Sequence, residues 1–283
     1  MQKAIQIPYN DRFALKCRLA SAAGFRHISV SLYEMLGKTQ DEWDRGTEDI
    51  CRILDETGLA CVQTHPYYYD LRISSEIERE DCEFAIRQAI VTGGRLGAGW
   101  CALHPRSSLT TGRYAKQSLE DNRRAFDGYL ELAVRSGTGI AAENLPIFHD
   151  IVPVIPFYSN SYDDLCELVD SFSDTHMGIC WDFDHANLMH MDQTEALRYM
   201  GKRIRCTHVH NNFGDSDRHL TPDQGNVPWE KIMPALAATG YDGPLTLEVH
   251  CCYADRDLLA SFARHSHACL VYLESLCGCA KSE

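Results

Sequence analysis

The stretch Ile204-Arg-Cys-Thr-His-Val-His210 is a short apolar run that ends in two histidines. Its length and its β-branched residues are typical of a buried strand. Similar runs cover residues 3–7, 25–32, 59–65, 99–104, 139–145, 177–183 and 244–249. Longer amphipathic stretches separate them, among them 76–91, 114–135 and 162–172, and a last one covers 258–276. Eight strands that alternate with helices predict a single (β/α)8 barrel over residues 1–283.

The competing architecture is an open, doubly wound sheet. That fold favours a glycine-rich turn after the first strand, and the segment Gln6-Ile-Pro-Tyr-Asn-Asp11 contains no glycine. The length of 283 residues would also allow two domains, but barrels commonly form one unit of this size. No linker, low-complexity segment or charge block marks a boundary.

Composition excludes several classes of protein. With 40 acidic and 27 basic residues, the chain has a formal charge of −13, which argues against binding to nucleic acid. It contains no apolar run of membrane-spanning length, and its first residues do not resemble a signal peptide. Its 13 cysteines are odd in number and scattered, unlike a secreted disulfide framework. We therefore expect a cytoplasmic protein in which most cysteines are small buried side chains.

Residues able to bind a metal stand at or near the ends of six predicted strands. They are His65, His104, Glu143, Asp182, His208, His210 and Glu248. The four from 65 to 182 follow one another in steps of 39, and the step from 210 to 248 is 38. Because one strand–helix unit returns the chain to the same height, these residues should form a ring at the C-terminal mouth of the barrel.

Carboxylates and imidazoles without a thiolate are common ligands of a divalent ion such as Zn or Mn. A single histidine at a strand end is more often structural. Glu248, between Leu247 and Val249, is harder to explain in that way, because a buried carboxylate is costly unless it is paired or bound to metal. Matched heights on six strands favour a metal site over coincidence.

The segment from His208 to Trp229 carries a more specific signal. It reads His-Val-His-Asn-Asn-Phe-Gly-Asp-Ser-Asp-Arg-His-Leu-Thr-Pro-Asp-Gln-Gly-Asn-Val-Pro-Trp. It is similar to the pattern His-x-His-Asp-Asn-x-Gly…Asp-x-His-Leu…Gly-x-Gly-x-(Ile/Val)-x-Trp of the xylose-isomerase-like TIM-barrel superfamily. Asn211 replaces the usual Asp, and Asp223 stands where Gly is common. Members of this superfamily include sugar isomerases and epimerases, inosose dehydratases and zinc-dependent apurinic endonucleases.

The resemblance implies a metal site formed by Glu143, Asp182, His210 and Glu248. Glu143 and Glu248 also resemble the acid/base pair of the epimerase branch, and His185 resembles a histidine that orients a substrate oxygen. The residues expected to contact substrate are His65, His104, His185, His208, Asp217 and His219. In the endonuclease branch, residues matching His65, His104, His185, Asp217 and His219 bind further metals. We therefore expect one ion, with donors for up to three.

The favoured function is a metal-dependent isomerase or epimerase that acts on a sugar, sugar phosphate or related polyol. Two alternatives stay open, namely a phosphoester hydrolase of the apurinic endonuclease type and a lyase like inosose dehydratase. Arg106 and Arg218 are candidates for binding a phosphate, or are solvated loop charges. Trp100, Trp181 and Phe183 either form an apolar wall for the sugar or belong to the core. The sequence leaves the oligomeric state open.

Overall fold

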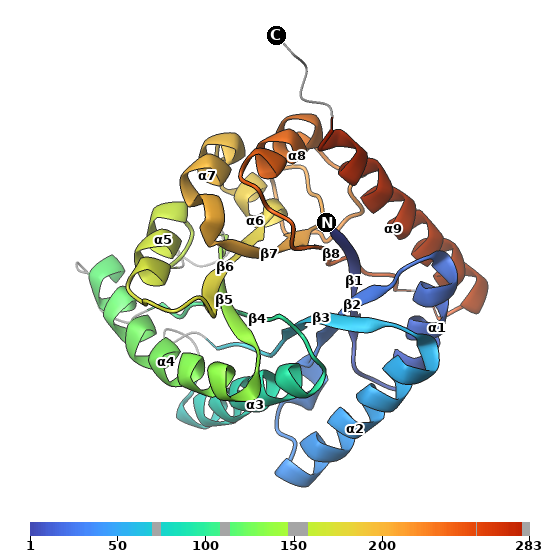
Figure 1. Cartoon of the computed structure of the whole chain (residues 1–283), viewed down its shortest axis with the longest axis horizontal. Coiled ribbons are helices and arrows are strands. Elements are labelled where there is room, and N and C mark those ends of the chain that lie inside the picture. The colour runs from blue at the N-terminus through green and yellow to red at the C-terminus, as the bar shows by residue number, and fades with distance from the viewer. Residues whose placement is uncertain (70–74, 108–113, 147–157, 253, 279–283) are drawn as a thin grey trace.

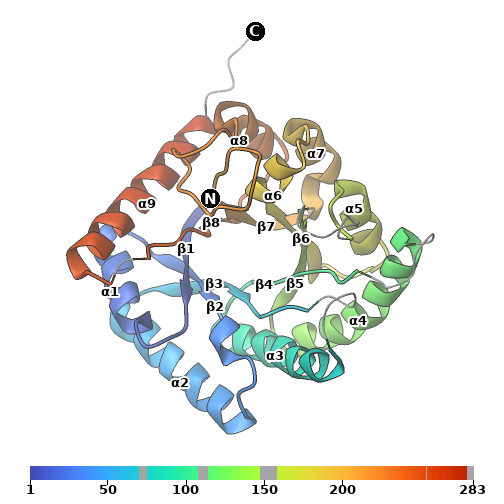
Figure 2. The ribbon, with the colours of Figure 1, turned by 180° about the vertical axis from the view of Figure 1, so that it is seen from behind.

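The computed structural model describes residues 1–69, 75–107, 114–146, 158–252 and 254–278 (Figure 1). Within these residues eight parallel strands form a closed barrel in the order β1 to β8, and helices surround it (Figures 1 and 2). The strands are β1 (Gln2–Pro8), β2 (His27–Ser31), β3 (Ala60–His65), β4 (Trp100–Leu103), β5 (Gly139–Glu143), β6 (Met177–Asp182), β7 (Ile204–Val209) and β8 (Pro244–Leu247). The predicted (β/α)8 barrel is confirmed, and each strand lies within or overlaps its predicted run.

The helices occupy the amphipathic stretches between the strands. They are α1 (Phe13–Ala23), α2 (Gln40–Thr57), α3 (Glu76–Arg95), α4 (Tyr114–Ser136), α5 (Tyr162–Asp170), α6 (Phe183–Leu188), α7 (Gln193–Met200), α8 (Trp229–Ala238) and α9 (Arg256–Leu276), with short 3-10 turns at Tyr33–Met35 and Gly201–Arg203. The long helices α2 and α3 both begin with a capping box. In α2, the Thr39 hydroxyl accepts a hydrogen bond from the Glu42 amide, and the Glu42 carboxylate accepts one from the Thr39 amide. Such reciprocal bonds satisfy amide groups that the first turn leaves unpaired.

Hydrophobic packing is divided between two places. The main core lies between the strands and the helices, where Trp43, Phe126 and Trp181 are almost fully buried. A second, smaller cluster consists of Ala102, Ala141, Cys180 and Cys206 on β4 to β7. Because side chains alternate along a strand, these small residues stand one layer below Glu143, Asp182 and His208.

The pairing of β6 and β7 contains a one-residue shift. Ile179 pairs with Ile204, but the next pair is Cys180 with Cys206, so the register skips Arg205. From that point Asp182 lies opposite His208, whereas an unbroken register would place it opposite Thr207. A β-bulge of this kind changes which side chains share a face, and here it aligns an acidic residue with a histidine.

The described cysteines are free thiols, and eight of them are buried, in agreement with the expectation from their scattered positions. In the part of the chain that the structure describes, none of the helices is both long and apolar enough to cross a membrane.

Candidate active site

A cavity of about 340 Å³ opens at the C-terminal ends of the strands. The predicted site residues that line it are His65, His104, Glu143, His185, Asp217, His219 and Glu248. Each comes from a strand end or from the segment that follows it, which for His185 is helix α6. The closed barrel thus brings residues more than 180 positions apart into one cavity. Asp182, His208 and His210 lie beneath them and are fully buried.

Glu143 lies at the centre of a group of imidazoles. Nε2 of His65 and Nε2 of His104 each lie 3.2 Å from its Oε2, and Nδ1 of His208 lies 3.0 Å from its Oε1. The side chain is 1% exposed. Burial alone would raise the pKa of Glu143, but the imidazoles of His208 and His104 outweigh it and lower the pKa well below its usual value. The glutamate is therefore ionised and enclosed.

Three carboxylates converge on Nδ1 of His208. This atom lies 3.0 Å from Oε1 of Glu143, 3.1 Å from Oε2 of Glu248 and 3.7 Å from Oδ2 of Asp182. On the other side of the ring, Nε2 lies 2.5 Å from the Gln63 amide nitrogen. Burial disfavours the charged imidazole, yet Glu143 and Glu248 outweigh it and raise the pKa of His208 to about 10. A positive charge is thus favoured where the three carboxylates meet.

His210 lies two residues after His208 and directly follows the last residue of β7. Its Nε2 lies 2.7 Å from Oδ2 of Asp182, and its Nδ1 lies 3.4 Å from Oδ2 of Asp184. The ring stacks on His219, with 4.3 Å between the ring centroids. Of the predicted metal ligands, Glu143, Asp182 and Glu248 therefore all lie close to Nδ1 of His208. His210 joins this group through Asp182, and it also forms a compact group of potential donors with His219 and Glu248.

The remaining predicted residues form the outer side of the same site. Nδ1 of His185 lies 3.6 Å from Oε1 of Glu143, and its Nε2 lies 3.7 Å from Oδ2 of Asp217. Oδ1 of Asp217 also lies 3.3 Å from Nε2 of His219. Burial would raise the pKa of Asp217, but His185 and His219 outweigh it and lower the pKa. Several overlapping groups of three donors therefore lie close enough to bind a metal, among them Asp182 with His185 and His210, and His65 with His104 and Glu143.

Comparison of the sequence with models of known protein families identifies one family. The model of the xylose isomerase-like TIM barrel family matches residues 17–264. The chain belongs to this family. The match spans all helices and strands of the barrel except β1, the start of α1 and the end of α9.

Similar proteins include one of unspecified activity and several epimerases. A protein of Sinorhizobium fredii is 27% identical over 96% of this chain and 92% of its own length. A D-psicose 3-epimerase of Enterocloster bolteae is 30% identical over a shorter segment, which is 31% of this chain and 28% of that protein. Among solved structures, a D-tagatose 3-epimerase-like protein aligns with a TM-score of 0.74 at 20% identity and covers 98% of both chains. At this level of sequence identity, the structural similarity shows a shared fold and nothing further.

Sequence reasoning missed the aromatic side of the cavity. Tyr33 and Tyr68 line it, and Tyr68 lies against His104 with 4.2 Å between ring centroids. Tyr33 contacts His65 edge to face at 5.2 Å. The run of three tyrosines at 67–69, directly after a strand that ends in His65, was the available signal. In this family such a position faces the mouth of the barrel.

The predicted aromatic wall of Trp100, Trp181 and Phe183 is not found. Trp181 and Phe183 are fully buried in the core between strands and helices, and Trp100 begins β4 at the opposite end of the barrel. The core alternative was correct for Trp181 and Phe183, because side chains alternate along β6 and Trp181 faces the helices when Asp182 faces the barrel axis.

The two arginines considered for phosphate binding have partners in the protein. The Arg106 guanidinium lies 2.8 Å from Oε1 of Glu83 and 2.6 Å from the Tyr129 hydroxyl. Arg218 forms two contacts with Asp215, of 2.6 and 3.1 Å. Neither arginine is among the described residues that line the cavity.

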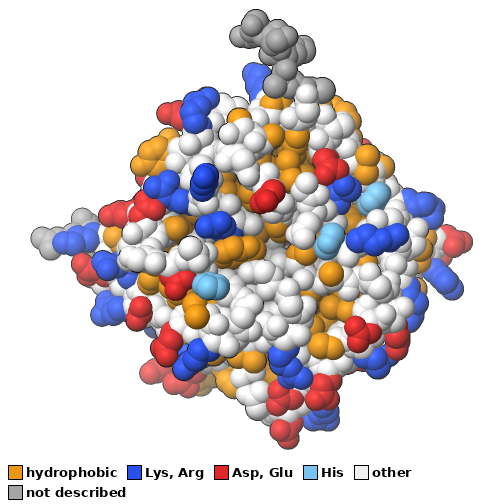
Figure 3. Space-filling view, in the orientation of Figure 1, with side chains coloured by type: hydrophobic (Ala, Val, Ile, Leu, Met, Phe, Trp, Pro, Cys, Tyr) orange, Lys and Arg blue, Asp and Glu red, His pale blue; other side chains and the backbone are white. Residues whose placement is uncertain are grey.

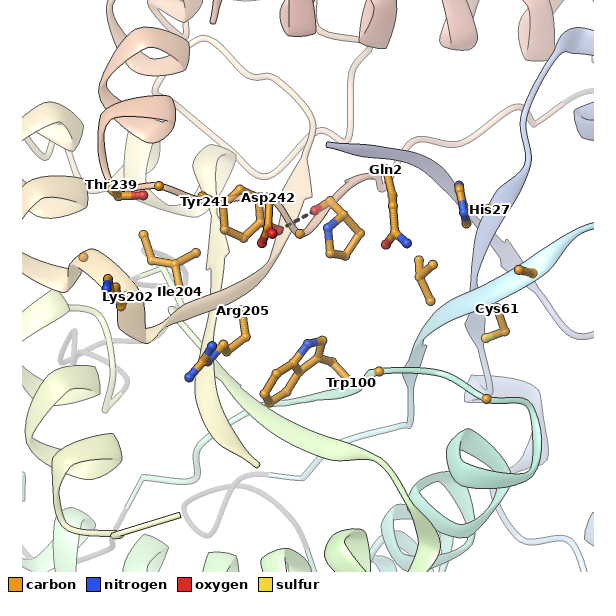
Figure 4. A pocket seen from close by; sticks show the side chains of 18 residues that line it. Gln2, His27, Cys61, Trp100, Lys202, Ile204, Arg205, Thr239, Tyr241 and Asp242 are labelled. Atoms are coloured by element: carbon orange, nitrogen blue, oxygen red, sulfur yellow. Dashed lines mark hydrogen bonds between the residues drawn. The ribbon is translucent and has the colours of Figure 1, made fainter. Parts of the chain in front are cut away.

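A second and larger cavity, of about 700 Å³, lies at the N-terminal ends of the strands. Figure 4 shows Trp100 and Arg205 side by side in it, with His27 and Asp242 also in its lining. The Arg205 guanidinium lies 5.7 Å from the centre of the Trp100 ring. Figure 3, which shows the molecule in the orientation of Figure 1, has Lys, Arg, Asp and Glu side chains interspersed over the face. The described lining of this cavity contains one carboxylate and one histidine, so it lacks the dense donor set of the mouth.

Proposed function

We propose that the protein is a divalent-metal-dependent isomerase or epimerase that acts on a sugar or a related polyol. The observation that carries the proposal is the pair Glu143 and Glu248, which come from opposite parts of the strand order and line one cavity. Both carboxylates contact the same nitrogen of His208, so the two contacting oxygens are no more than about 6 Å apart. The similarity to a D-psicose 3-epimerase supports sugar chemistry.

The donors fit a divalent ion. Glu143, Asp182 and Glu248 are buried carboxylates that lie close to Nδ1 of His208. Such a group is costly without a positive charge, and a divalent ion bound beside a neutral His208 would supply it. We propose these three as ligands together with an imidazole. The sequence motif favours His210, and the geometry adds His208 as a second candidate. When bound, the ion would polarise a carbonyl and an adjacent hydroxyl of the substrate.

Proton transfer would fall to the two glutamates. The Glu248 oxygens contact Gln6 at 2.9 Å and His208 at 3.1 Å, whereas four imidazoles surround the Glu143 carboxylate. We assign to Glu248 the removal of a proton from carbon next to the carbonyl, and to Glu143 its return. His65, His104 and His185 would orient substrate oxygens, since their rings line the cavity beside Glu143.

The cavity suits a small neutral substrate. Its volume of about 340 Å³ is near the lower end of small-molecule sites. Tyr33 and Tyr68 supply aromatic surface for the C–H face of a sugar, and Glu248 and His219 supply polar groups in the same cavity. The described lining residues include no Lys or Arg, which favours an unphosphorylated sugar over a sugar phosphate.

A phosphoester hydrolase is the second candidate, because His65, His104, His185, Asp217 and His219 all lie in the mouth and supply donors for further ions. The formal charge of −13 opposes it, since contacts to phosphates supply much of the affinity for DNA. A lyase that removes water would use the same two glutamates.

One series of measurements separates the three activities. Metal analysis of the purified protein comes first, followed by incubation with keto sugars in deuterated water. An isomerase or epimerase should exchange a substrate C–H with solvent and leave the mass otherwise unchanged. Loss of water from the product would indicate the lyase. Nicking of abasic DNA without exchange on any keto sugar would overturn the proposal.

A further inference from the structure

Three potential metal ligands form a compact group outside the barrel mouth. They are Asp223, in the loop between β7 and α8, and His265 and Cys269 on α9. Oδ1 of Asp223 lies 3.0 Å from Nε2 of His265 and 3.5 Å from Sγ of Cys269, and Sγ lies 3.6 Å from the same Nε2. Each residue therefore offers one donor atom to a common point.

The backbone holds these donors in place. His265 and Cys269 are four residues apart on one helix, so they share a face. Asp223 belongs to a turn in which the Gln224 amide donates to the Thr221 carbonyl at 2.8 Å. The Pro222 carbonyl in that turn accepts hydrogen bonds from the Asn211 side chain at 2.7 Å and the Trp229 ring at 2.9 Å. Binding at this group would thus require little rearrangement of the chain.

The distances match those of a zinc centre. A tetrahedral ion with Zn–S near 2.3 Å and Zn–N and Zn–O near 2.0–2.2 Å separates its donors by about 3.3–3.6 Å. Two of the observed separations, 3.5 and 3.6 Å, fall in this range, and the third, 3.0 Å between Asp223 and His265, would have to widen by about 0.3 Å. Cys269 is 7% exposed, whereas the side chains of His265 and Asp223 are 47% and 51% exposed, so the outer side of the group is open to solvent.

We propose that Asp223, His265 and Cys269 form a second metal site, which binds Zn²⁺ with a water molecule in the fourth position. The thiolate gives this site a different preference from the mouth, because soft sulfur ligands select zinc over magnesium, calcium or manganese. Binding displaces one proton from the Cys269 thiol, which leaves as the Zn–S bond forms, while neutral His265 and ionised Asp223 coordinate directly.

The site would link two parts of the molecule that meet only at the surface. The loop that carries Asp223 also carries Asp217 and His219, which line the active-site cavity. Zinc bound at Asp223, His265 and Cys269 would fasten this loop to α9. Asp223 stands where glycine is common in the family pattern. The inference concerns a site separate from the proposed sugar chemistry and can fail or succeed without it.

Cobalt substitution tests the proposal. Metal-free full-length protein is titrated with Co²⁺, which shows a strong thiolate-to-metal charge-transfer absorption in the near ultraviolet only when sulfur is a ligand. We expect this band in the native protein and its loss in Cys269→Ala. Asp223→Asn and His265→Ala, both at exposed positions, should lower the affinity for Zn²⁺ by about 100-fold or more, since even outer residues of a site contribute 10–100-fold.

Matched controls locate the sulfur. Cys277→Ala removes another thiol from the end of α9, where Sγ contacts the Met233 carbonyl, and should keep the band. Cys180→Ala removes the thiol closest to the mouth and should also keep it. Glu248→Gln should leave the band unchanged, which separates this site from the mouth. No charge-transfer band in the native protein, or a band that persists in folded Cys269→Ala protein, would overturn the proposal.

Discussion

The two ends of the barrel differ in a way that cavity size does not reveal. The N-terminal end has the larger cavity, about 700 Å³ against about 340 Å³ at the mouth. Its lining combines the first residues of strands with turns, in which Gly97, Gly201 and Gly240 have positive φ. The smaller cavity at the mouth brings together carboxylates and imidazoles that would repel or cost energy if they were alone.

The difference follows from strand direction and alternation. All eight strands end at the mouth, and each can present one inward side chain there, followed by a loop. At the other end, the corresponding positions begin the strands and include Gln2, Trp100 and Pro244. In this fold the C-terminal ends of the strands therefore determine where reactive side chains gather. The size of a cavity at the other end does not indicate a site.

The largest expected effect is at the mouth. Glu248→Gln keeps the size of the side chain and an oxygen donor but removes the basic carboxylate. We expect turnover of an active keto sugar to fall by about 10²–10⁴-fold, as for a positioned general base. Rates of solvent deuterium exchange, measured with the bound metal quantified in the same samples, check this. Full activity at normal metal occupancy would show that Glu248 is not the base.

A second comparison distinguishes His208 and His210, the two histidines at the end of β7. We expect His208→Gln to weaken binding of the proposed metal ion more than His210→Gln, by about 10–100-fold, because Nδ1 of His208 lies where three carboxylates converge. Calorimetric titration of metal-free protein with Mn²⁺ gives both affinities. The opposite order would assign the ligand to His210, as the sequence motif predicts.

A smaller effect, on stability, is expected at Arg106, which lies in the segment after β4 and pairs with Glu83 on α3. Arg106→Met leaves the partly buried Glu83 carboxylate without its guanidinium partner. Loss of hydrogen bonds to a charged group should lower the free energy of unfolding by about 1–3 kcal/mol, measured in urea. Arg218→Met is the matched control, because its exposed pair with Asp215 should contribute less than about 1 kcal/mol. Equal losses of unfolding free energy in both variants would show that the Arg106–Glu83 pair contributes no more than an exposed pair.

The smallest effect is expected at the N-terminal cavity. Arg205→Gln removes a charge that stacks on Trp100 and should cost about 1 kcal/mol or less of stability. Turnover should stay within about twofold of the native protein, since cation–π contact is the only role assigned to this side chain. A large loss of activity would show that the two ends are coupled.

Much of the fold and of the site could be predicted from the sequence. Regular steps of 39 residues predict similar heights for His65, His104, Glu143 and Asp182, and the structure places both histidines against Glu143 with Asp182 buried beneath them. Periodicity is sufficient here because each strand–helix unit has nearly the same length. The assignment of ligand roles stays a prediction.

Other features depend on details that periodicity does not encode. The register skips Arg205, and this shift decides that His208 lies opposite Asp182. A one-residue shift has no signature in the composition of a strand. The aromatic wall of Tyr33 and Tyr68 depends on how two loops fold back, and the approach of Asp223 to α9 depends on the tertiary packing of a loop against a helix.

The layer of small residues under the mouth has a consequence for how this protein could diversify. Ala102, Ala141, Cys180 and Cys206 form a floor directly below Glu143, Asp182 and His208, and they are fully buried. Exchanges among alanine, cysteine and serine at these positions would raise or lower that floor by about one atom, at the modest cost of small changes in a packed interior. Evolution, or a protein engineer, can therefore adjust the depth of the cavity while every carboxylate and imidazole at the mouth is kept.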